Sequence, residues 1–330
     1  MKKYRVAVVG ATGMVGRKMV EVLEERKFPI ETLHLFSSAK SAGKSISFAG
    51  EDHIAEELCE NSFDGKGIEI ALFSAGGEIS RKYAPIAASK GVVVIDNSSA
   101  WRMDEKVPLV VPEVNPQAAA SHQGIIANPN CSTIQSVVPL KGLHERFRIR
   151  RIVYSTYQSV SGSGVGGLED LERGLRGETP LKYPRPIAFN CLPHIDVFGP
   201  EGYTKEEIKM IEETRKILGD QTLRITATTV RVPVRFGHCV SMNLEFDRSF
   251  EMQEIFDCLR SSAGVALVDD REKGLYPTPL DAEGKDGVFI GRVRRDLSLE
   301  NGIHLWAVAD NIRKGAATNS VQIAELLIQK

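Results

Sequence analysis

A cysteine stands where a helix is expected to begin. Residues 128–131 read Asn-Pro-Asn-Cys, and the following STIQSVVPLKGL repeats apolar residues at helical spacing, which predicts a helix beginning near Ser132. Unpaired N–H groups at a helix N-terminus stabilise a thiolate and can also hold an oxyanion. Cys131 is therefore a candidate nucleophile, although a lone cysteine is often a small buried hydrophobic residue.

A thiolate nucleophile needs a partner that handles protons, and His238 is the best placed of the seven histidines. It follows RVPVRFG, in which a strand reaches a glycine and the chain must turn. We therefore expect its ring at the edge of a cleft instead of in a core. Arg231 on the same strand could present its guanidinium fork to a carboxylate, but with Arg235 it could equally mark an exposed strand face.

A second group of charged residues lies near position 204. Thr204 followed by Glu207 is a capping box, which predicts the start of a helix and gives Glu207 a structural role. Glu206 and Lys209 would lie side by side on that helix, where they could meet an amine and a phosphate or simply form a solvated salt bridge. Arg102 follows a predicted strand at the carboxyl end of a parallel sheet, where ligands bind in this architecture.

The sequence GATGMVG near the N-terminus places three glycines, Gly10, Gly13 and Gly16, between a strand and a helix. Such a turn lets a dinucleotide pyrophosphate approach backbone N–H groups and the positive end of the helix. After the second predicted strand, where an NAD-binding domain usually carries an acidic residue, this chain has Ser38, Lys40 and Ser41. Hydroxyls and a cation suit a 2′-phosphate, so the prediction is NADP, the alternative being a solvated serine-rich loop.

Two other patterns could be mistaken for ligand sites. The glycines of SGSGVGG, at 162, 164 and 167, match G-x-G-x-x-G, but no βαβ unit surrounds them, so we expect a backbone segment that either contacts the nicotinamide end or is only a turn. Cys191 and His194 form C-x-x-H, which His238 and Cys239 could complete as a metal site on paper. Adjacent strand residues point to opposite faces, so no metal is expected.

The elements that must position these residues fall into two groups. Up to about residue 130, short apolar strands alternate with helices, which predicts a doubly wound, Rossmann-like parallel sheet. From about residue 131 to 310 the strands are longer and alternate, which predicts an α+β catalytic and dimerisation domain. Gly177 to Gly202 is expected to be a surface excursion, and Asn311 to Gln329 a helix that packs back on the first domain. The predicted domains are thus 1–130 with 311–330, and 131–310.

Composition excludes several classes of protein. Over 330 residues, 42 Lys and Arg face 43 Asp and Glu, which argues against nucleic acid as a partner. No apolar run approaches the roughly 20 residues of a membrane-spanning helix. The five cysteines are odd in number and widely spaced, which favours free thiols and a reducing compartment. We expect a soluble cytoplasmic protein.

Seven segments taken in order, GATGMVG, DNSSAWR, VPEVN, NPNCST, YQSVSGSG, RVPVRFGH and DNIRKGAA, resemble the bacterial aspartate-semialdehyde dehydrogenases over nearly the whole chain. The resemblance implies a homodimer that uses NADP to reduce L-aspartyl 4-phosphate to L-aspartate 4-semialdehyde, with release of phosphate, on the route to lysine, threonine and methionine. Cys239 departs from the pattern, because serine is more usual there, and a second thiol near the site could make the enzyme sensitive to oxidation.

The resemblance also implies a role for each matching residue. Cys131 would be the acyl-thioester nucleophile, His238 the general acid/base, and Gln158 would orient the substrate. Arg231 would bind its α-carboxylate and Glu206 its amino group, while Arg102 and Lys209 would bind the phosphate. The cofactor would contact the glycine turn, the loop after the second strand, the nicotinamide-side segment and the closing helix through Gly10, Thr12, Gly13, Met14, Val15, Gly16, Ser38, Lys40, Ser41, Ser161, Gly162 and Asn311.

Two other functions fit parts of the pattern. An N-acetylglutamyl-phosphate reductase runs the same thioester and hydride chemistry on a longer, acylated substrate, but its cysteine motif would read nearer PGCYPT. A non-catalytic NADP-binding regulator could have kept the fold. The joint presence of Cys131, Gln158 and His238 argues against this loss of activity.

Overall fold

The computed structural model describes residues 2–328, which fold into two compact units. The first unit comprises the chain up to Asn130 and again from Ala316 onward, and the second comprises Cys131–Gly315. The chain returns to the first unit at residue 316, whereas the sequence predicted this return at residue 311. The last residue of the predicted closing helix, Gln329, lies outside the described residues.

The first unit is built on a six-stranded sheet in the order β5-β2-β1-β6-β7-β8, with every neighbouring pair parallel. In chain order this is a 3-2-1-4-5-6 arrangement, the doubly wound order that reverses direction between β1 and β6. The strands are β1 (Tyr4–Val9), β2 (Ile30–Ser37), β5 (Glu56–Glu57), β6 (Ile70–Phe73), β7 (Val93–Asp96) and β8 (Ile125–Ala127). The short β5 and β8, and a hairpin of β3 (Ser45–Phe48) and β4 (Glu51–Ile54), lack the long apolar runs that sequence reasoning relies on.

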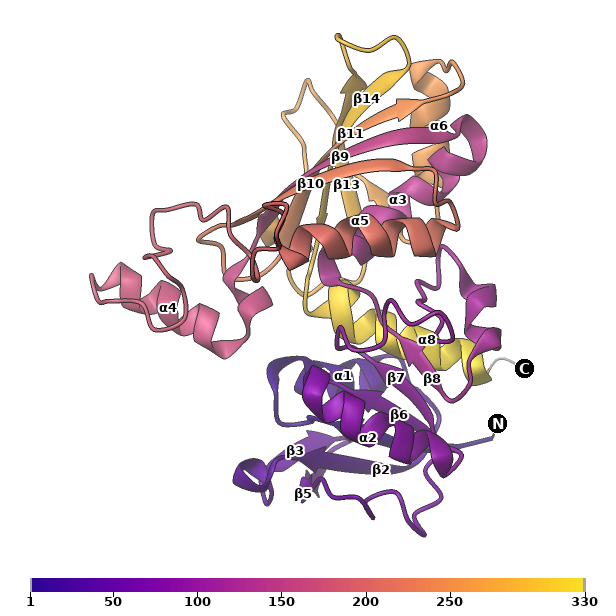
Figure 1. Cartoon of the computed structure of the whole chain (residues 1–330), viewed down its shortest axis with the longest axis vertical. Helices are drawn as coiled ribbons and strands as arrows, with labels where there is room; N and C mark the ends of the chain where they lie inside the picture. Colours follow the sequence, from indigo (N-terminus) through magenta and orange to yellow (C-terminus); the bar gives the residue numbers. More distant parts are fainter. Residues whose placement is uncertain (1, 329–330) are drawn as a thin grey trace. The chain divides into compact units, whose positions relative to one another are not determined.

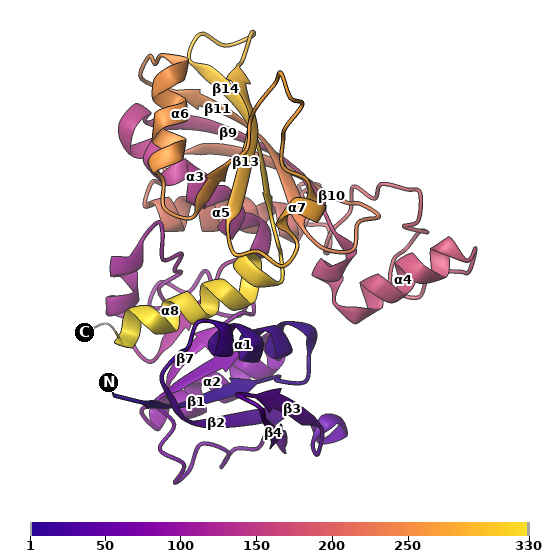
Figure 2. The same ribbon diagram turned by 180° about the vertical axis from the view of Figure 1, so that it is seen from behind.

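Helices cover both faces of this sheet. In Figure 1, α2 (Gly77–Ser89) lies in front of the sheet. In Figure 2, which views the molecule from the opposite side, α1 (Met14–Glu25) lies in front. The closing helix α8 (Thr318–Ile328) contacts α1 and β7, and its Val321, Ile323 and Ala324 join the core of this unit. Short 3-10 segments, η1 (Ala39–Ser41) and η2 (Pro116–Ser121), complete the unit.

The second unit is built on a mixed six-stranded sheet in the order β10-β9-β11-β14-β13-β12. Only the pairs at its two edges, β10 with β9 and β12 with β13, are parallel. The strands are β9 (Ile149–Gln158), β10 (Arg224–Arg231), β11 (His238–Phe246), β12 (Val265–Leu267), β13 (Val288–Arg295) and β14 (Gly302–Ala309). The alternating sequence patterns predicted β9, β10 and β11, and each has one face more exposed than the other.

One layer of helices covers this sheet. The central helix α3 (Cys131–Phe147) contacts α5 (Lys205–Leu218) on one side and α6 (Met252–Ser261) on the other, and it lies on β9, β11, β13 and β14. Eleven of the 17 residues of α3 are buried, including the polar side chains of its first turn. A short helix, α7 (Pro279–Ala282), and a π-helical turn, Arg313–Ala317, lie further along the chain.

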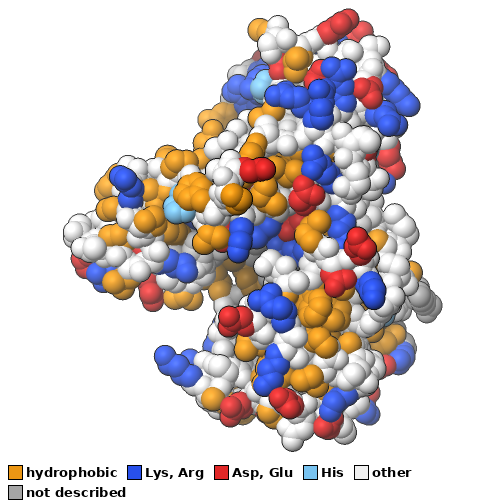
Figure 3. All heavy atoms as spheres, viewed as in Figure 1, with side chains coloured by type: hydrophobic (Ala, Val, Ile, Leu, Met, Phe, Trp, Pro, Cys, Tyr) orange, Lys and Arg blue, Asp and Glu red, His pale blue; other side chains and the backbone are white. Residues whose placement is uncertain are grey.

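A smaller lobe of the second unit holds the predicted excursion. It consists of η3 (Val160–Ser163), α4 (Val165–Leu175) and the segment that follows, around a separate core of Val160, Leu171, Ile187 and Leu192. The Asp170 carboxylate accepts three backbone N–H groups, from Leu181, Lys182 and Tyr183, and thereby fixes the start of the excursion to α4. Figure 3 shows hydrophobic side chains gathered on the surface of this lobe. Within residues 2–328, no helix combines the length and apolarity that crossing a bilayer requires.

Candidate active site

The glycine turn lies at the point where the order of the first sheet reverses. Gly10 has φ of +81°, and a Cβ there would overlap the Ser74 carbonyl at the end of β6, so only glycine fits. Gly13 caps α1 with no side chain bonded to the first-turn N–H groups, and Gly16, Met14 and Val15 follow in that turn. An anion at this point would therefore meet backbone donors and the positive end of the helix.

A cavity of about 320 Å³ opens beside this turn. It is lined by Val9, Gly10, Thr12, Gly13, Ser37, Ser38, Leu58, Ser74, Ala75, Ile79 and Tyr83. Lys40 and Ser41 lie in η1, directly after the Ser37 and Ser38 wall, and the Lys40 side chain is exposed. Sequence reasoning missed Leu58, which follows β5, and Ile79 and Tyr83 on α2, because none of them belongs to a motif.

Cys131 is the first residue of α3, one position earlier than predicted, and its side chain is partly exposed. A Cβ on Gly315 would come within 2.9 Å of the Cys131 Cβ, so the glycine of DNIRKGAA lets the chain pass closely. One turn further along α3, the Gln135 amide donates to the His238 carbonyl at 3.1 Å. This bond connects the helix of the cysteine to the strand of the histidine.

The prediction that His238 lies at the edge of a cleft and not in a core is wrong, because the residue is 0% exposed and begins β11. Its Nδ1 lies 3.0 Å from both the backbone N–H and the hydroxyl of Ser159. Its Nε2 is buried without a hydrogen-bond partner in the described structure. Burial first and the Arg231 charge second hold the pKa of His238 well below its usual range, so the ring is neutral near pH 7.

Arg231 ends β10 and is only 5% exposed, so the alternative of an exposed strand face is wrong for this residue. Arg235, in contrast, is exposed. Arg231 Nη1 donates to the Ser159 carbonyl at 2.7 Å, whereas Arg231 Nε is buried without a partner among residues 2–328. A Cβ on Gly162 would come within 2.8 Å of Arg231 Nη1 and 3.1 Å of His238 Nε2. His238 Nε2 and the Arg231 guanidinium therefore both lie beside Gly162, and their unsatisfied buried polar atoms suit a polar ligand.

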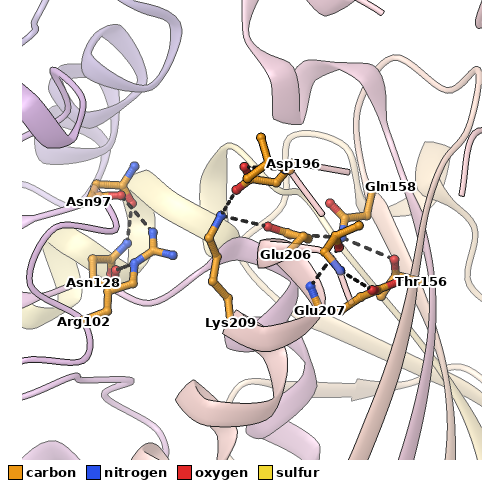
Figure 4. Close-up of polar contacts among 11 residues, drawn as sticks. Asn97, Arg102, Asn128, Thr156, Gln158, Asp196, Glu206, Glu207 and Lys209 are labelled. Atoms are coloured by element: carbon orange, nitrogen blue, oxygen red, sulfur yellow. Dashed lines mark hydrogen bonds and ion pairs between the residues drawn. The ribbon is translucent and has the colours of Figure 1, made fainter. Parts of the chain in front are cut away.

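A chain of contacts joins Gln158 to α5 and the excursion (Figure 4). The Gln158 amide donates to Glu206 Oε1 at 3.2 Å, and Lys209 Nζ lies 3.3 Å from Glu206 Oε2 and 2.7 Å from Asp196 Oδ2. Glu206 is 5% exposed, so the solvated-pair alternative is wrong for this carboxylate. Asp196, which sequence reasoning missed, comes from the excursion, so that segment helps to build the site.

Glu207 has the predicted structural role and a further one. The capping box with Thr204 is present, which confirms the predicted helix start. The other oxygen of the Glu207 carboxylate accepts the backbone N–H of Thr229 on β10 at 3.0 Å. One buried carboxylate thus fixes the start of α5, and with it Glu206, to the strand that ends in Arg231.

In the first unit, backbone carbonyls hold Arg102 in place. Its Nε donates to the Asn128 carbonyl and its Nη2 to the Asn97 carbonyl, both at 3.0 Å (Figure 4). The Asn128 amide in turn donates to Asn97 Oδ1 and accepts from Asn319 of α8. This positions a rigid cation at the carboxyl end of the first sheet, as an oxyanion ligand would require.

Asn311 and Ser161 lie close to His238. Asn311 was predicted on the closing helix, but α8 begins only at Thr318, because a π-helical turn follows Asn311. Its Oδ1 accepts from the Ser159 hydroxyl and the Gly237 backbone N–H, and its Nδ2 donates to the Ser161 hydroxyl. Among residues 2–328, no group of three or more His, Cys, Asp or Glu is arranged to hold an ion.

Cys239 does not support the expected sensitivity to oxidation. Its side chain packs with Ala282 and Val308, and burial raises its pKa to about 12. A thiol that stays protonated is a poor nucleophile and is not readily oxidised.

Comparison with protein families assigns both units. A family described as "Semialdehyde dehydrogenase, NAD binding domain" matches residues 5–122, and one described as "Semialdehyde dehydrogenase, dimerisation domain" matches residues 140–314. The first supports a nicotinamide cofactor in the unit that carries the glycine turn. The second covers most of the unit that carries the predicted catalytic residues.

Individual relatives agree along the whole chain. An aspartate-semialdehyde dehydrogenase of Aquifex aeolicus is 53% identical over 337 residues, which cover 99% of this chain and 98% of that protein. The crystal structure of aspartate semialdehyde dehydrogenase II from Vibrio cholerae, complexed with ASA, has a TM-score of 0.96 and 48% identity over 100% of this chain and 99% of that one. The aspartate semialdehyde dehydrogenase from Candida albicans, solved with NADP, has a TM-score of 0.79 and 26% identity over 99% and 98% of the two chains. The chain therefore belongs to the family of aspartate-semialdehyde dehydrogenases.

Proposed function

We propose that this chain catalyses the reversible, NADP-dependent reduction of L-aspartyl 4-phosphate to L-aspartate 4-semialdehyde, a step toward lysine, threonine and methionine. The observation that carries the proposal is a pair of buried side chains beside Gly162, Arg231 and His238, whose Nε and Nε2 atoms lack a partner among residues 2–328. Buried polar groups are rarely left unsatisfied unless a ligand or water completes them. Both side chains lie in the unit that begins with Cys131.

The cofactor proposal rests on the glycine turn and the cavity beside it. Gly13 leaves the first turn of α1 uncovered, and the cavity continues past Ser37 and Ser38. Lys40, exposed in η1 just beyond them, supplies a cation where an acidic residue would be needed for NAD. These features support NADP, which is also the ligand in the Candida albicans relative.

The two polar ends of the substrate match two groups in the second unit. Arg231 is held by the Ser159 carbonyl through Nη1, so its Nε edge can bind a carboxylate side-on. Glu206 presents a buried carboxylate to an amine, and its fixed position depends on Gln158, Lys209 and the Glu207 anchor. A free amine would gain a charge-assisted bond there, whereas an N-acetylated amine would not.

Phosphate binding is proposed for Arg102 and Lys209. Arg102 is a fixed cation at a sheet edge, and Lys209 is balanced by Glu206 and Asp196. A phosphate that binds here adds negative charge beside these two carboxylates. The positive charge of the Lys209 ammonium offsets the repulsion between them. The pairing with two carboxylates keeps Lys209 ordered between turnovers.

The chemistry follows from these positions. The Cys131 thiolate attacks the acyl carbon, the carbonyl oxygen becomes an oxyanion, and its collapse expels phosphate and leaves a thioester. NADPH, when bound, supplies a hydride to the thioester carbon. His238 acts as the general acid/base and supplies a proton as the hemithioacetal collapses and the aldehyde leaves Cys131. Gln158, on the strand before Ser159, orients the acyl group.

The assembly and location are proposed as well. The family over residues 140–314 is described as a dimerisation domain, which supports a homodimer. Tyr154 bonds to Thr214 of α5, so by strand alternation Tyr157 lies on the opposite face of the sheet, where it contacts Trp306 at 5.3 Å and is 41% exposed. Such an aromatic surface suits a second copy of the chain. None of the five cysteines forms a disulfide, which suits the cytoplasm.

The test is a substrate comparison. The purified protein is mixed with NADP, phosphate and either aspartate 4-semialdehyde or N-acetylglutamate semialdehyde, and NADPH is followed by its absorbance. We expect phosphate-dependent turnover with the first substrate and at most traces with the second. Turnover with only the second would reassign the substrate, and NADPH binding without either turnover would favour a regulator.

A further inference from the structure

Two carboxylates share the ammonium of Lys209. Its Nζ lies 2.7 Å from Asp196 Oδ2 and 3.3 Å from Glu206 Oε2 (Figure 4). The shorter contact is thus made to the aspartate of the excursion, and the longer one to the residue proposed to bind the amine of the substrate. The side chain of Glu206 is 7% exposed, whereas that of Asp196 is 33% exposed. Lys209 therefore bridges a buried carboxylate and a partly solvated one.

The backbone of the excursion holds Asp196 in this place. Asp196 has φ of +69°, a conformation that few residues besides glycine, asparagine and aspartate adopt. Its Oδ1 accepts the backbone N–H of Val197 at 2.9 Å, which leaves Oδ2 for Lys209. The Val197 carbonyl in turn accepts the backbone N–H of Lys205, the first residue of α5, at 2.9 Å. Asp196 is therefore fixed to the same helix that carries Glu206 and Lys209.

The excursion is also bound to the strand that carries Arg231. Leu192 and Arg231 form an antiparallel bridge, in which the Leu192 N–H donates at 2.9 Å and the Arg231 N–H at 2.8 Å. Three residues lie between Leu192 and Asp196. One short segment therefore contacts both the residue proposed to bind the carboxylate of the substrate and the lysine beside the proposed amine site.

The charges of this cluster suit an amine. Glu206, Asp196 and Lys209 together bring two carboxylates and one ammonium. Because Lys209 also binds Asp196, it does not fully neutralise Glu206, and negative charge remains there for an incoming ammonium group. Without the Asp196 carboxylate, the Lys209 ammonium would pair with Glu206 alone. An incoming amine would then compete with Lys209 for the Glu206 carboxylate.

The surroundings of Asp196 favour its charged form. Burial acts to raise the pKa of Asp196, but the hydrogen bond and the charge of Lys209 oppose it. The Val197 N–H and the charge of Lys205 act in the same direction as Lys209, and the pKa of Asp196 lies below its usual range. The carboxylate is therefore ionised near pH 7.

We propose that Asp196 is a specificity-determining residue: by drawing the Lys209 ammonium away from Glu206, it keeps the Glu206 carboxylate available for the free amine of the substrate. This role rests on the proposed function, which assigns the amine to Glu206 and the phosphate to Lys209. Asp196 acts through these two residues and is not required to touch the substrate. The excursion thereby takes part in the choice of a substrate with a free α-amine.

Two aldehydes that differ only in the amine test this role. Succinate semialdehyde is aspartate 4-semialdehyde without its amino group, and both are assayed with NADP and phosphate. Asp196→Asn keeps the size of the side chain and suits the positive φ, but it removes the negative charge. We expect kcat/KM for aspartate 4-semialdehyde to fall about ten-fold, the lower end of what a charge-assisted hydrogen bond contributes. The kcat/KM for succinate semialdehyde should stay nearly unchanged.

The KM for phosphate separates this role from a simple alignment of Lys209. Removing a negative charge beside the phosphate should leave this KM unchanged or lower it, whereas loss of Lys209 alignment would raise it. Glu201→Gln is the matched control, because Glu201 is exposed in the same excursion, and it should change none of these values. Lys209→Gln, which keeps both carboxylates, should raise the KM for phosphate and retain the preference for the amine.

The outcomes are distinct. Equal changes with both aldehydes in Asp196→Asn, or a raised KM for phosphate in that variant, would overturn the proposal. Thermal unfolding shows whether Asp196→Asn is folded, and if it is not, Lys209→Gln decides, since loss of the preference for the amine in Lys209→Gln would equally overturn it. If the wild type did not turn over aspartate 4-semialdehyde at all, the proposed function would fall, and the role of Asp196 with it.

Discussion

Arg231→Lys tests how the substrate is recognised. The guanidinium is 5% exposed and donates through Nη1 to the Ser159 carbonyl, and its Nε has no partner in the described part of the chain. Lysine keeps the positive charge but has a single nitrogen at its end. It therefore cannot both satisfy the Ser159 carbonyl and bind a carboxylate side-on.

The expected loss follows from one charge-assisted hydrogen bond. Such a bond contributes about 1.5–3 kcal/mol, and each 1.36 kcal/mol corresponds to a factor of ten. The kcat/KM for aspartate 4-semialdehyde should therefore fall about 10- to 160-fold. Because the Ser159 carbonyl can lose its donor as well, thermal unfolding is measured in parallel to account for any loss of stability.

A substrate analogue assigns the loss to the carboxylate. 3-Aminopropanal is aspartate semialdehyde without its α-carboxylate, so its kcat/KM should be low with the wild type and nearly the same with Arg231→Lys. Arg235→Lys is the matched control, because Arg235 lies four residues later, is exposed and pairs with Glu172. If Arg231→Lys lowered kcat/KM equally for both substrates, the carboxylate role of Arg231 would be refuted.

Three further predictions concern other parts of the chain. Lys40→Ala should weaken NADPH binding far more than NADH binding in a fluorescence titration, and equal losses would refute the 2′-phosphate role. Gly162→Ala should abolish turnover while the protein stays folded, because the new Cβ would lie 2.8 Å from Arg231 Nη1 and 3.1 Å from His238 Nε2. Near-normal turnover would show that the substrate does not bind beside these two groups. Glu207→Gln should cost about 1–3 kcal/mol, since one backbone N–H loses its acceptor, and lower Tm by about 2–4 °C per kcal/mol in a thermal melt. An unchanged Tm would mean that the two backbone bonds of Glu207 are not needed.

Sequence reasoning succeeded where the signal is local. The glycine turn, the capping box at Thr204 and the helix that begins at Cys131 each depend on residues within one turn of one another. The alternating pattern likewise predicts the strands β9, β10 and β11. Each of these features is fixed by neighbouring residues, so the sequence alone predicts it.

The remaining features depend on contacts between distant segments. His238 was expected at a cleft edge, but its burial depends on Ser159 and Asn311, 79 residues before it and 73 after it. Asp196 could not be paired with Lys209 from the sequence, because the excursion that carries it has no periodicity. The ends of short strands such as β5 and β8 are set by their neighbours in the sheet. The spacing of residues within one segment therefore cannot predict these contacts.

The central claim is that Cys131 carries the acyl group, and mass spectrometry of the acid-quenched protein and of its peptides tests it most directly. The enzyme is mixed with aspartate 4-semialdehyde and NADP in the absence of phosphate, quenched in acid and digested for peptide mapping. We predict one aspartyl adduct per chain on Cys131, formed together with one equivalent of NADPH and discharged when phosphate is added before the quench. An adduct on another cysteine such as Cys191, or NADPH formation without any adduct, would contradict the account.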